Sequence, residues 1–210
     1  MPAAFEKQSY WHDRFASETS FEWLTSSAAF MDVLTPYLQH IPNSAQILHL
    51  GSGTSDLQNH LRRWGFLNVT NIDYEPLALE RGQQLESNQF GDVRTKYLVV
   101  DATRLELEEK FQVAIDKSTA DAIACGEEDA VSSMAKGIWR CLDDDGFWFS
   151  LSYSAWRFEH VQDLFEVEVI SKVPTPRQKP TDPDIFHYCY LLRPRRQFPG
   201  QVCRGAQTSS

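Results

Sequence analysis

The spacing of hydrophobic and polar residues changes repeatedly along the chain and predicts a succession of strands and helices. Short apolar or alternating runs that end at glycine or aspartate are typical of strands, whereas apolar residues three and four apart are typical of helices. Strands are predicted at residues 46–50, 68–73, 95–100, 111–116 and 147–152. Helices are predicted at residues 28–38, 55–64, 76–87 and 127–142. Because parallel neighbours need crossover connections, this alternation predicts a parallel sheet covered on both faces, which is the α/β class.

The last third of the chain lacks this helical pattern. Two runs rich in β-forming residues, 164–172 and 186–192, flank a proline-rich loop. Strands joined without a crossover helix pair antiparallel. Together with the five parallel strands, these two runs predict a Rossmann-like seven-stranded, mostly parallel sheet with helices on both faces and a C-terminal antiparallel hairpin.

The length of 210 residues is enough for one large core and too short for two, so we expect a single domain over residues 1–193. Its predicted parts are an N-terminal aromatic lid and helix (9–42), a ligand-binding core (46–153) and the hairpin (164–193). The remaining stretch, 194–210, is rich in Arg, Pro, Gly and Ser and is predicted to be a flexible tail.

The charge balance argues against a nucleic-acid partner. Twenty basic and 29 acidic residues give a net charge of −9, which disfavours binding by broad neutralisation of phosphates. The charge is uneven, however, because the chain from Lys172 onward carries seven basic and two acidic residues. This C-terminal part is the place where an acidic partner could dock.

Neither a membrane segment nor a metal site is expected. No apolar run approaches the roughly 20 residues that cross a bilayer, and the N-terminus lacks the regions of a secretory signal, so we expect a cytoplasmic protein. The histidines have no ligand spacing. The four cysteines, Cys125, Cys141, Cys189 and Cys203, form no C-x-x-C pair.

Polar groups follow the carboxyl ends of four predicted parallel strands, the edge at which open α/β sheets bind ligands. The glycine turn 51–53 lets the backbone approach a ligand closely. Asp73 either accepts hydrogen bonds from both hydroxyls of a ribose or caps the next helix. Asp101 suits an adenine edge or a turn, and Asp116 lies beside the reacting end of a ligand or is a plain cap. Asp56 stands where a dinucleotide fingerprint needs a third glycine, which disfavours a pyrophosphate cofactor.

Six short motifs occur in order along residues 10–122. They are Tyr10-Trp11-x-x-Arg14-Phe15, Phe21-Glu22-Trp23, Leu50-Gly51-Ser52-Gly53-Thr54-Ser55, Asn71-Ile72-Asp73-Tyr74, Asp101-Ala102 and Asp116-Lys117-Ser118-Thr119-Ala120-Asp121-Ala122. With these motifs the sequence resembles the class I S-adenosylmethionine-dependent methyltransferases, and within them the group that includes lysine methyltransferases of translation elongation factors. The family pattern for the last motif has glycine where this chain has Ser118, which affects the expected substrate more than the expected cofactor.

The resemblance implies that the core 46–153 binds S-adenosylmethionine and releases S-adenosylhomocysteine. By matching position, the implied cofactor-binding residues are Gly51 and Gly53 at the methionine part, Asp73 and Tyr74 at the ribose and adenine, Asp101 and Ala102 at the adenine edge, Trp11, Phe15 and Trp23 in the lid, and Lys117 in the pocket wall. Aromatic faces suit a sulfonium cation and exclude water from it. The alternative for the three lid aromatics is that they are core residues covering the edge of the sheet.

Methyl transfer needs alignment and no catalytic triad. An acceptor lysine must lose a proton, and we hypothesise that Asp116, at the end of the fourth strand, receives it as the catalytic residue. The leading functional hypothesis is N-methylation of a lysine of a protein. The alternatives are O-, N- or S-methylation of a small molecule and a cofactor-binding subunit without catalytic activity.

Overall fold

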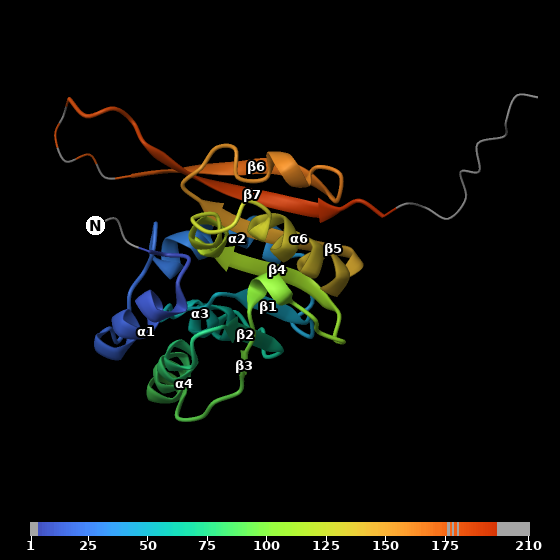
Figure 1. Cartoon of the computed structure of the whole chain (residues 1–210). Coiled ribbons are helices and arrows are strands. Elements are labelled where there is room, and N and C mark those ends of the chain that lie inside the picture. Colours follow the sequence, from blue (N-terminus) through green and yellow to red (C-terminus); the bar gives the residue numbers. More distant parts are fainter. Residues whose placement is uncertain (1–3, 176, 178, 180, 197–210) are drawn as a thin grey trace, which may run out of the picture.

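The computed structural model describes residues 4–175, 177, 179 and 181–196, and its centre is a seven-stranded sheet (Figure 1). In chain order the strands are β1 (Ile47–Leu50), β2 (Val69–Asp73), β3 (Lys96–Val99), β4 (Phe111–Lys117), β5 (Leu142–Ser152), β6 (Phe165–Pro174) and β7 (Phe186–Pro194). Their order across the sheet is β3-β2-β1-β4-β5-β7-β6. The first five run parallel, and β7 is antiparallel to both β5 and β6. The Rossmann-like α/β fold with a C-terminal hairpin, predicted from the sequence, is confirmed.

Helices cover both faces of this sheet. They are α1 (Gln8–Ser17), α2 (Ser27–Leu38), α3 (Leu57–Arg63), α4 (Pro76–Phe90), α5 (Thr119–Ile123) and α6 (Ala130–Cys141), with single turns η1 (Ala102–Arg104) and η2 (Glu159–Val161). Successive strand residues point to opposite faces. On β1, Leu48 packs in the core beneath α6, whereas Ile47 packs in the core beneath α2 and α3. Figure 1 shows the β6–β7 pair at one edge of the sheet and β3 with α4 at the other.

β5 begins five residues earlier than the sequence pattern indicates. The acidic stretch 143–146, interpreted as a turn, lies within the strand, and Leu142 already pairs with Phe111 of β4. The register of the β4–β5 pairing shifts between Phe111 and Val113, so these two strands contain an irregular segment at this point. Gly146 lies so close to the carbonyl oxygens of Phe111 and Asp143 that a Cβ there would meet both within about 3.1 Å. Three aspartates followed by a glycine predict a turn from the sequence, but in the structure they form the irregular start of a strand.

The C-terminal prediction lies largely outside the described residues, which end at 196. Of the predicted flexible tail 194–210, Pro194 closes β7, and the Arg195 N–H donates to the Leu164 carbonyl at 2.7 Å. The Arg196 guanidinium lies over the Trp139 ring at 4.1 Å. Within the described part of the chain, no helix is long and apolar enough to cross a membrane.

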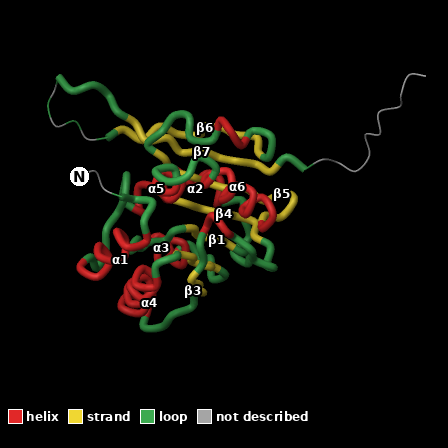
Figure 2. Tube along the Cα trace, viewed as in Figure 1, coloured by secondary structure: helices red, strands yellow, loops and turns green. Residues whose placement is uncertain are grey.

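The parallel register brings the polar strand ends to one edge of the sheet. Leu50 pairs with both Ile72 and Asp116, and Asp73 pairs with Val99, so β1 to β4 end at neighbouring positions. Figure 2 shows α1 at this same end, beside α4. The N-terminal segment therefore covers the edge at which the strand-end loops meet.

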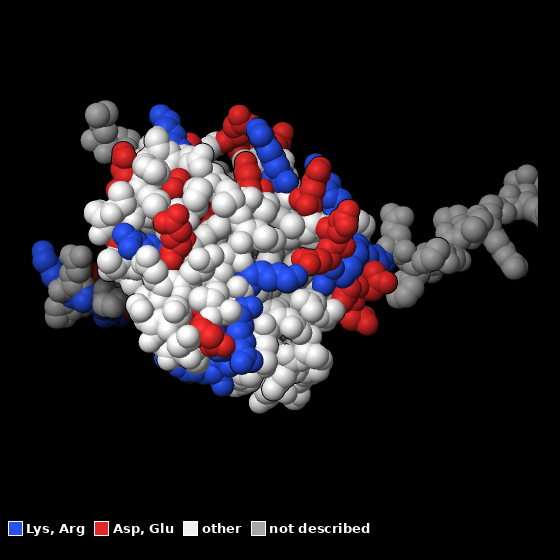
Figure 3. Space-filling view, turned by 90° about the horizontal axis from the view of Figure 1, so that it is seen from below, with Lys and Arg blue, Asp and Glu red and all other residues white. Residues whose placement is uncertain are grey.

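The face that Figure 3 shows carries basic and acidic side chains beside one another. Near β3, Lys96 pairs with Glu109 at 2.7 Å, and Arg62 pairs with the buried Glu86 at 2.8 Å. Such mixed pairs do not make a continuous basic surface for phosphates.

Candidate functional site

A cavity of about 400 Å³ lies at the carboxyl edge of the parallel strands. Its walls come from the loops after β1 to β4, the segment before α1, α1 itself and the turn after α5. All ten residues that the family resemblance assigned to a cofactor line it: Trp11, Phe15, Trp23, Gly51, Gly53, Asp73, Tyr74, Asp101, Ala102 and Lys117. The structure thus brings together residues that are up to 106 positions apart in the chain.

The two glycines of the turn leave the backbone bare on either side of Ser52. Gly51 and Gly53 have φ of +55° and +51°, in the left-handed region that glycine adopts without strain. A Cβ at Gly51 would lie 2.3 Å from the Thr119 hydroxyl oxygen, and that hydroxyl donates to the Leu50 carbonyl at 2.9 Å. At Gly53 a Cβ would meet only the tip of Phe15, at 3.7 Å, across the cavity wall. The turn therefore packs tightly against the start of α5 at Gly51, and its backbone at Gly53 faces the cavity without a side chain.

Asp73 is the buried carboxylate of the site. It is 5% exposed, and its two oxygens accept the N–H groups of Gly53 at 2.9 Å and Glu75 at 3.0 Å. Burial raises the pKa of Asp73 to about 6, although these backbone hydrogen bonds oppose the shift. Asp73 thus both fixes the turn before α4 and lines the cavity, so the two interpretations of its position are compatible.

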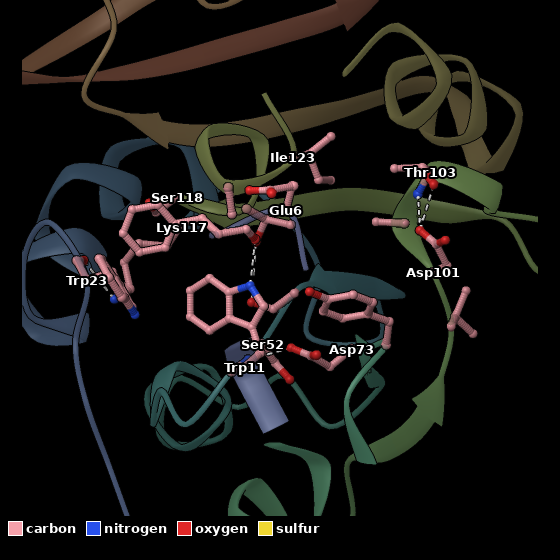
Figure 4. A pocket seen from close by; sticks show the side chains of 18 of the residues that line it. Glu6, Trp11, Trp23, Ser52, Asp73, Asp101, Thr103, Lys117, Ser118 and Ile123 are labelled. Carbon is pink, nitrogen blue, oxygen red and sulfur yellow. Dashed lines mark hydrogen bonds between the residues drawn. The ribbon is translucent and has the colours of Figure 1, made fainter. Parts of the chain in front are cut away.

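Asp101 lies at the far end of the cavity. Its carboxylate accepts hydrogen bonds from the Thr103 N–H at 2.9 Å and the Thr103 hydroxyl at 2.7 Å, as Figure 4 shows. It thereby caps η1 and presents its remaining oxygen near solvent. Burial, followed by the charges of Asp73 and Asp101, raises the pKa of Tyr74, so its phenol stays neutral. This end of the cavity combines two carboxylates with one neutral aromatic ring.

The aromatic lid begins earlier than the predicted boundary at residue 9. Phe5 and Glu6 also line the cavity, and the Trp11 indole N–H donates to the Phe5 carbonyl at 2.7 Å. The Trp11 ring lies 5.5 Å from that of Phe15 and 5.7 Å from that of Trp23. Phe15 is 3% exposed, so it is a core residue as well as part of the wall. An aromatic residue shortly before Tyr10 and Trp11 was the available signal for Phe5, but a single residue has no periodicity to detect.

Glu22 joins three parts of the chain, and we call its contacts the Glu22 clamp. Its carboxylate pairs with the Lys117 ammonium and accepts the hydroxyls of Ser27 at 2.7 Å and Ser55 at 3.0 Å, and the Asp56 N–H at 3.2 Å. Burial alone would raise the pKa of Glu22, but the adjacent Lys117 lowers it below its usual range. The clamp therefore ties the lid to the glycine turn and to the end of β4.

Lys117 fixes the lid backbone as well. Its ammonium donates to the carbonyls of Trp23 at 3.1 Å and Thr25 at 3.3 Å. These carbonyls flank Leu24, which has a left-handed φ of 64°. Since Lys117 is 7% exposed and fully engaged, it holds the wall of the cavity in place and is not available as an acid or base.

Asp116 does not reach the cavity. It has no exposed surface, and its carboxylate accepts the Trp148 indole N–H at 2.8 Å and the Ala120 N–H at 3.2 Å. Burial raises the pKa of Asp116 to about 7. A residue at a strand end can point into either layer, and this side chain points into the core, away from the acceptor that it was expected to deprotonate. The geometry gives Asp116 a structural role.

Asp116→Asn tests this placement. We expect the free energy of unfolding to fall by roughly 1–3 kcal/mol, because the amide NH₂ would face one of the two fixed N–H donors. We expect turnover at saturating substrates to stay within about threefold of wild type, since no reacting atom is near. The measurements are urea unfolding and turnover well below the unfolding midpoint. A turnover loss of 100-fold or more in a folded variant would restore the catalytic role.

Histidine also enters the site, which the sequence did not indicate. His49 on β1 lines the cavity and is 1% exposed, and its Nδ1 lies 3.2 Å from Oδ1, the side-chain amide oxygen of Asn71. Burial lowers the pKa of His49 to about 4, so the ring is neutral. In the described part of the chain, no group of three or more His, Cys, Asp or Glu residues is placed to hold a metal ion.

Comparison with known proteins places this geometry among enzymes of one kind. A family model described as a methyltransferase domain matches residues 48–150. Methyltransferase srdJ of Neurospora crassa is 57% identical over 197 residues, which are 91% of this chain and 84% of the relative. Human EEF1A lysine methyltransferase 2 is 31% identical over 144 residues, covering 65% of this chain and 60% of the relative. The Drosophila melanogaster eEF1A lysine and N-terminal methyltransferase homolog is 31% identical over 155 residues, but this chain spans only 22% of it.

Solved structures share the fold at low sequence identity. The N-methyltransferase NodS of Bradyrhizobium japonicum, solved with S-adenosylhomocysteine, aligns with a TM-score of 0.64 at 12% identity over 87% of this chain and 98% of its own. Magnesium protoporphyrin IX methyltransferase of Synechocystis, solved with S-adenosylmethionine, aligns with a TM-score of 0.66 at 10% identity over 92% of this chain and 98% of its own. At these identities the likeness concerns the fold.

Proposed function

Because this chain belongs to the S-adenosylmethionine-dependent methyltransferases, we propose that it N-methylates a lysine side chain of a protein. The observation that carries the proposal is the charge of the cavity. Four carboxylates line it, those of Glu6, Asp73, Asp101 and Glu127, against two cationic side chains. Of the cations, Lys117 is paired within the Glu22 clamp, and the Arg104 side chain is 87% exposed. The surplus of negative charge favours positively charged ligands, as both a sulfonium and a lysine ammonium are.

The residues present fit S-adenosylmethionine. The bare backbone at Gly53 leaves room that a side chain would take, and the donor and acceptor set is suited to a nucleoside. We assign the ribose hydroxyls to Asp73 and the adenine to Tyr74, Asp101 and Ala102. We assign the methionine part to the glycine turn, in agreement with the family resemblance. A volume of about 400 Å³ lies in the range of small-molecule sites.

When bound, S-adenosylmethionine would supply an electrophilic methyl group, to which an unprotonated amine forms an N–C bond as the C–S bond breaks, with S-adenosylhomocysteine as the leaving group and the proton of the methylated amine lost to solvent. The chain's own residues orient the reactants and control the surroundings. The rings of Trp11, Phe15 and Trp23 exclude water from this region and present aromatic faces to positive charge. Glu6 and Glu127 are both exposed at the cavity wall, where their carboxylate oxygens can attract an ammonium group.

Methylation of a small molecule is the second candidate. The loop after β5 carries two exposed aromatic side chains, Tyr153 at 55% and Trp156 at 70% exposure, at the same edge of the sheet as the cavity. Exposed rings beside a site can bind a flat apolar compound. The relative srdJ, which aligns with 91% of this chain, is named only as a methyltransferase, so its name does not favour either acceptor.

A labelling assay distinguishes the two candidates. The protein is incubated with S-adenosylmethionine labelled with tritium in its methyl group, together with purified elongation factor 1A or with a fractionated cell lysate. We expect label in a protein band and, after acid hydrolysis, in methylated lysine. Asp73→Ala protein serves as the control for label that does not depend on the site. Label confined to the small-molecule fraction would contradict the protein acceptor and support the second candidate.

A further inference from the structure

Ser118 has an unusual backbone conformation for a serine. It lies between β4 and α5 with φ 72° and ψ 2°, in the left-handed region. Within the described residues, Leu24 is the one other non-glycine residue with positive φ. The sheet and the helix both hold this conformation, because the Ser118 N–H donates to the Leu151 carbonyl at 2.9 Å and its carbonyl accepts the Ala122 N–H at 3.1 Å. A side chain kept where glycine is more stable indicates that the side chain has a function.

The Ser118 hydroxyl faces the cavity and has no hydrogen-bond partner within the described part of the chain. The neighbouring hydroxyls differ in this respect. Thr119 donates to the Leu50 carbonyl at 2.9 Å, and Ser55 donates to Glu22 at 3.0 Å. Ser118 is half-buried, so a ligand in the cavity can reach its hydroxyl without displacing a protein contact.

The position of Ser118 relates it to the acceptor end of the site. Figure 4 shows Ser118 beside Trp23 and Lys117, at the opposite end of the cavity from Asp101 and Thr103. If Asp101 contacts the adenine, then Ser118 lies at the end where the methyl group and the acceptor meet. This step rests on the proposed function.

We propose that the Ser118 hydroxyl oxygen accepts a hydrogen bond from an N–H of the acceptor amine and is thereby a specificity-determining residue. A neutral primary amine has two N–H groups, a secondary amine has one and a tertiary amine has none. The contact therefore supports addition of the first and second methyl groups and gives no support to the third. The substrate class is an amine that carries at least one N–H.

Two variants distinguish the effect of losing the Ser118 hydroxyl from the effect of relaxing the backbone conformation. Ser118→Ala keeps the Cβ and the strained conformation but removes the hydroxyl, whereas Ser118→Gly removes both. We expect both variants to lose about three- to tenfold in kcat/KM for the first two methyl additions, the effect of one hydrogen bond. The third addition and the S-adenosylmethionine affinity measured by calorimetry should not change. Ser118→Gly should also unfold at a higher temperature than Ser118→Ala, because glycine releases the strain.

Each result that departs from these expectations has a different consequence for the proposed role of Ser118. Full kcat/KM in Ser118→Ala, with a loss in Ser118→Gly alone, would overturn the inference, because backbone rigidity would then explain the position. A loss of S-adenosylmethionine affinity in Ser118→Ala would overturn it as well, since the hydroxyl would then serve the cofactor. Wild-type label on a small-molecule amine would contradict only the proposed protein acceptor, and the two variants assayed on that amine should then show the same loss of about three- to tenfold, whereas full kcat/KM of Ser118→Ala on it would overturn the Ser118 contact. Wild-type label on an oxygen or sulfur atom would overturn both.

Discussion

Asp73→Ala is expected to weaken S-adenosylmethionine binding by at least about 100-fold, because the proposed ribose contact consists of two charge-assisted hydrogen bonds, which contribute about 1.5–3 kcal/mol each. The carboxylate is 5% exposed and is held by the N–H groups of Gly53 and Glu75, so it is already in place before the ligand binds. The measurement is isothermal titration calorimetry on the unlabelled cofactor. Because the carboxylate is held in place before the cofactor binds, its removal should lower cofactor affinity as well as the rate of methyl transfer.

The matched control is Glu109→Gln, which removes a half-exposed carboxylate outside the cavity. It should bind the cofactor with wild-type affinity. Asp73→Ala should remain folded, because loss of two backbone hydrogen bonds is offset by removal of a buried carboxylate whose ionisation is unfavourable. A folded Asp73→Ala protein with affinity within threefold of wild type would contradict the assignment of the ribose.

The same carboxylate predicts two opposite pH trends. Its pKa of about 6 in the folded chain lies above the ordinary value, so the folded state binds this proton more tightly than the unfolded state does. Its contribution to the free energy of unfolding is therefore greatest below pH 4 and is lost as the pH rises through 6. Cofactor affinity should change the other way, falling between pH 7 and pH 5, because the protonated acid accepts hydrogen bonds poorly. Calorimetry across this range should show the fall in wild type and a flatter profile in Asp73→Asn.

The sequence predicted the sheet well because each parallel strand has its own local signal. Hydrophobic runs that end at glycine or aspartate mark the strands, and the strand ends of a parallel sheet must meet at one edge. That geometry is enough to gather Gly51, Asp73 and Asp101 around one cavity. It does not determine which layer a strand-end side chain enters, and for this reason Asp116 was expected in the site but lies in the core.

Contacts between distant segments had no local signal. Glu22 and Lys117 lie 95 positions apart, and each belongs to a motif that gives no indication of its partner. The left-handed conformation of Ser118 is likewise held by hydrogen bonds to β5 and α5, and a serine does not itself indicate it, although the glycine that the family pattern has at this position is consistent with it. The residues that line the cavity could therefore be predicted from the chain, whereas the clamp that holds the lid over them could not.

Breaking the Glu22 clamp is expected to have the second large effect. Glu22→Gln or Lys117→Met leaves one partner charged without its counterion, and loss of one member of a buried ion pair costs about 3–5 kcal/mol. We expect values near the lower limit, because the Glu22 side chain is 24% exposed although that of Lys117 is only 3% exposed. Since the clamp joins the lid to the glycine turn, S-adenosylmethionine affinity should also fall, by about tenfold or more. Urea unfolding and calorimetry measure the two effects.

The double variant Glu22→Gln with Lys117→Met separates the ion pair from the hydrogen bonds around it. With both charges removed, no buried charge is left unpaired, so the double variant should be more stable than the sum of the two single losses predicts. Affinity should recover less than stability, because Ser27, Ser55 and Asp56 all donate to one oxygen of Glu22, and the neutral amide oxygen of glutamine accepts these hydrogen bonds more weakly than a carboxylate does. The exposed pair Lys96 and Glu109 is the matched control, and its removal should cost no more than about 1 kcal/mol. If the clamp variants lose no more stability and affinity than this control pair, then the lid is held by its aromatic contacts and the clamp is incidental.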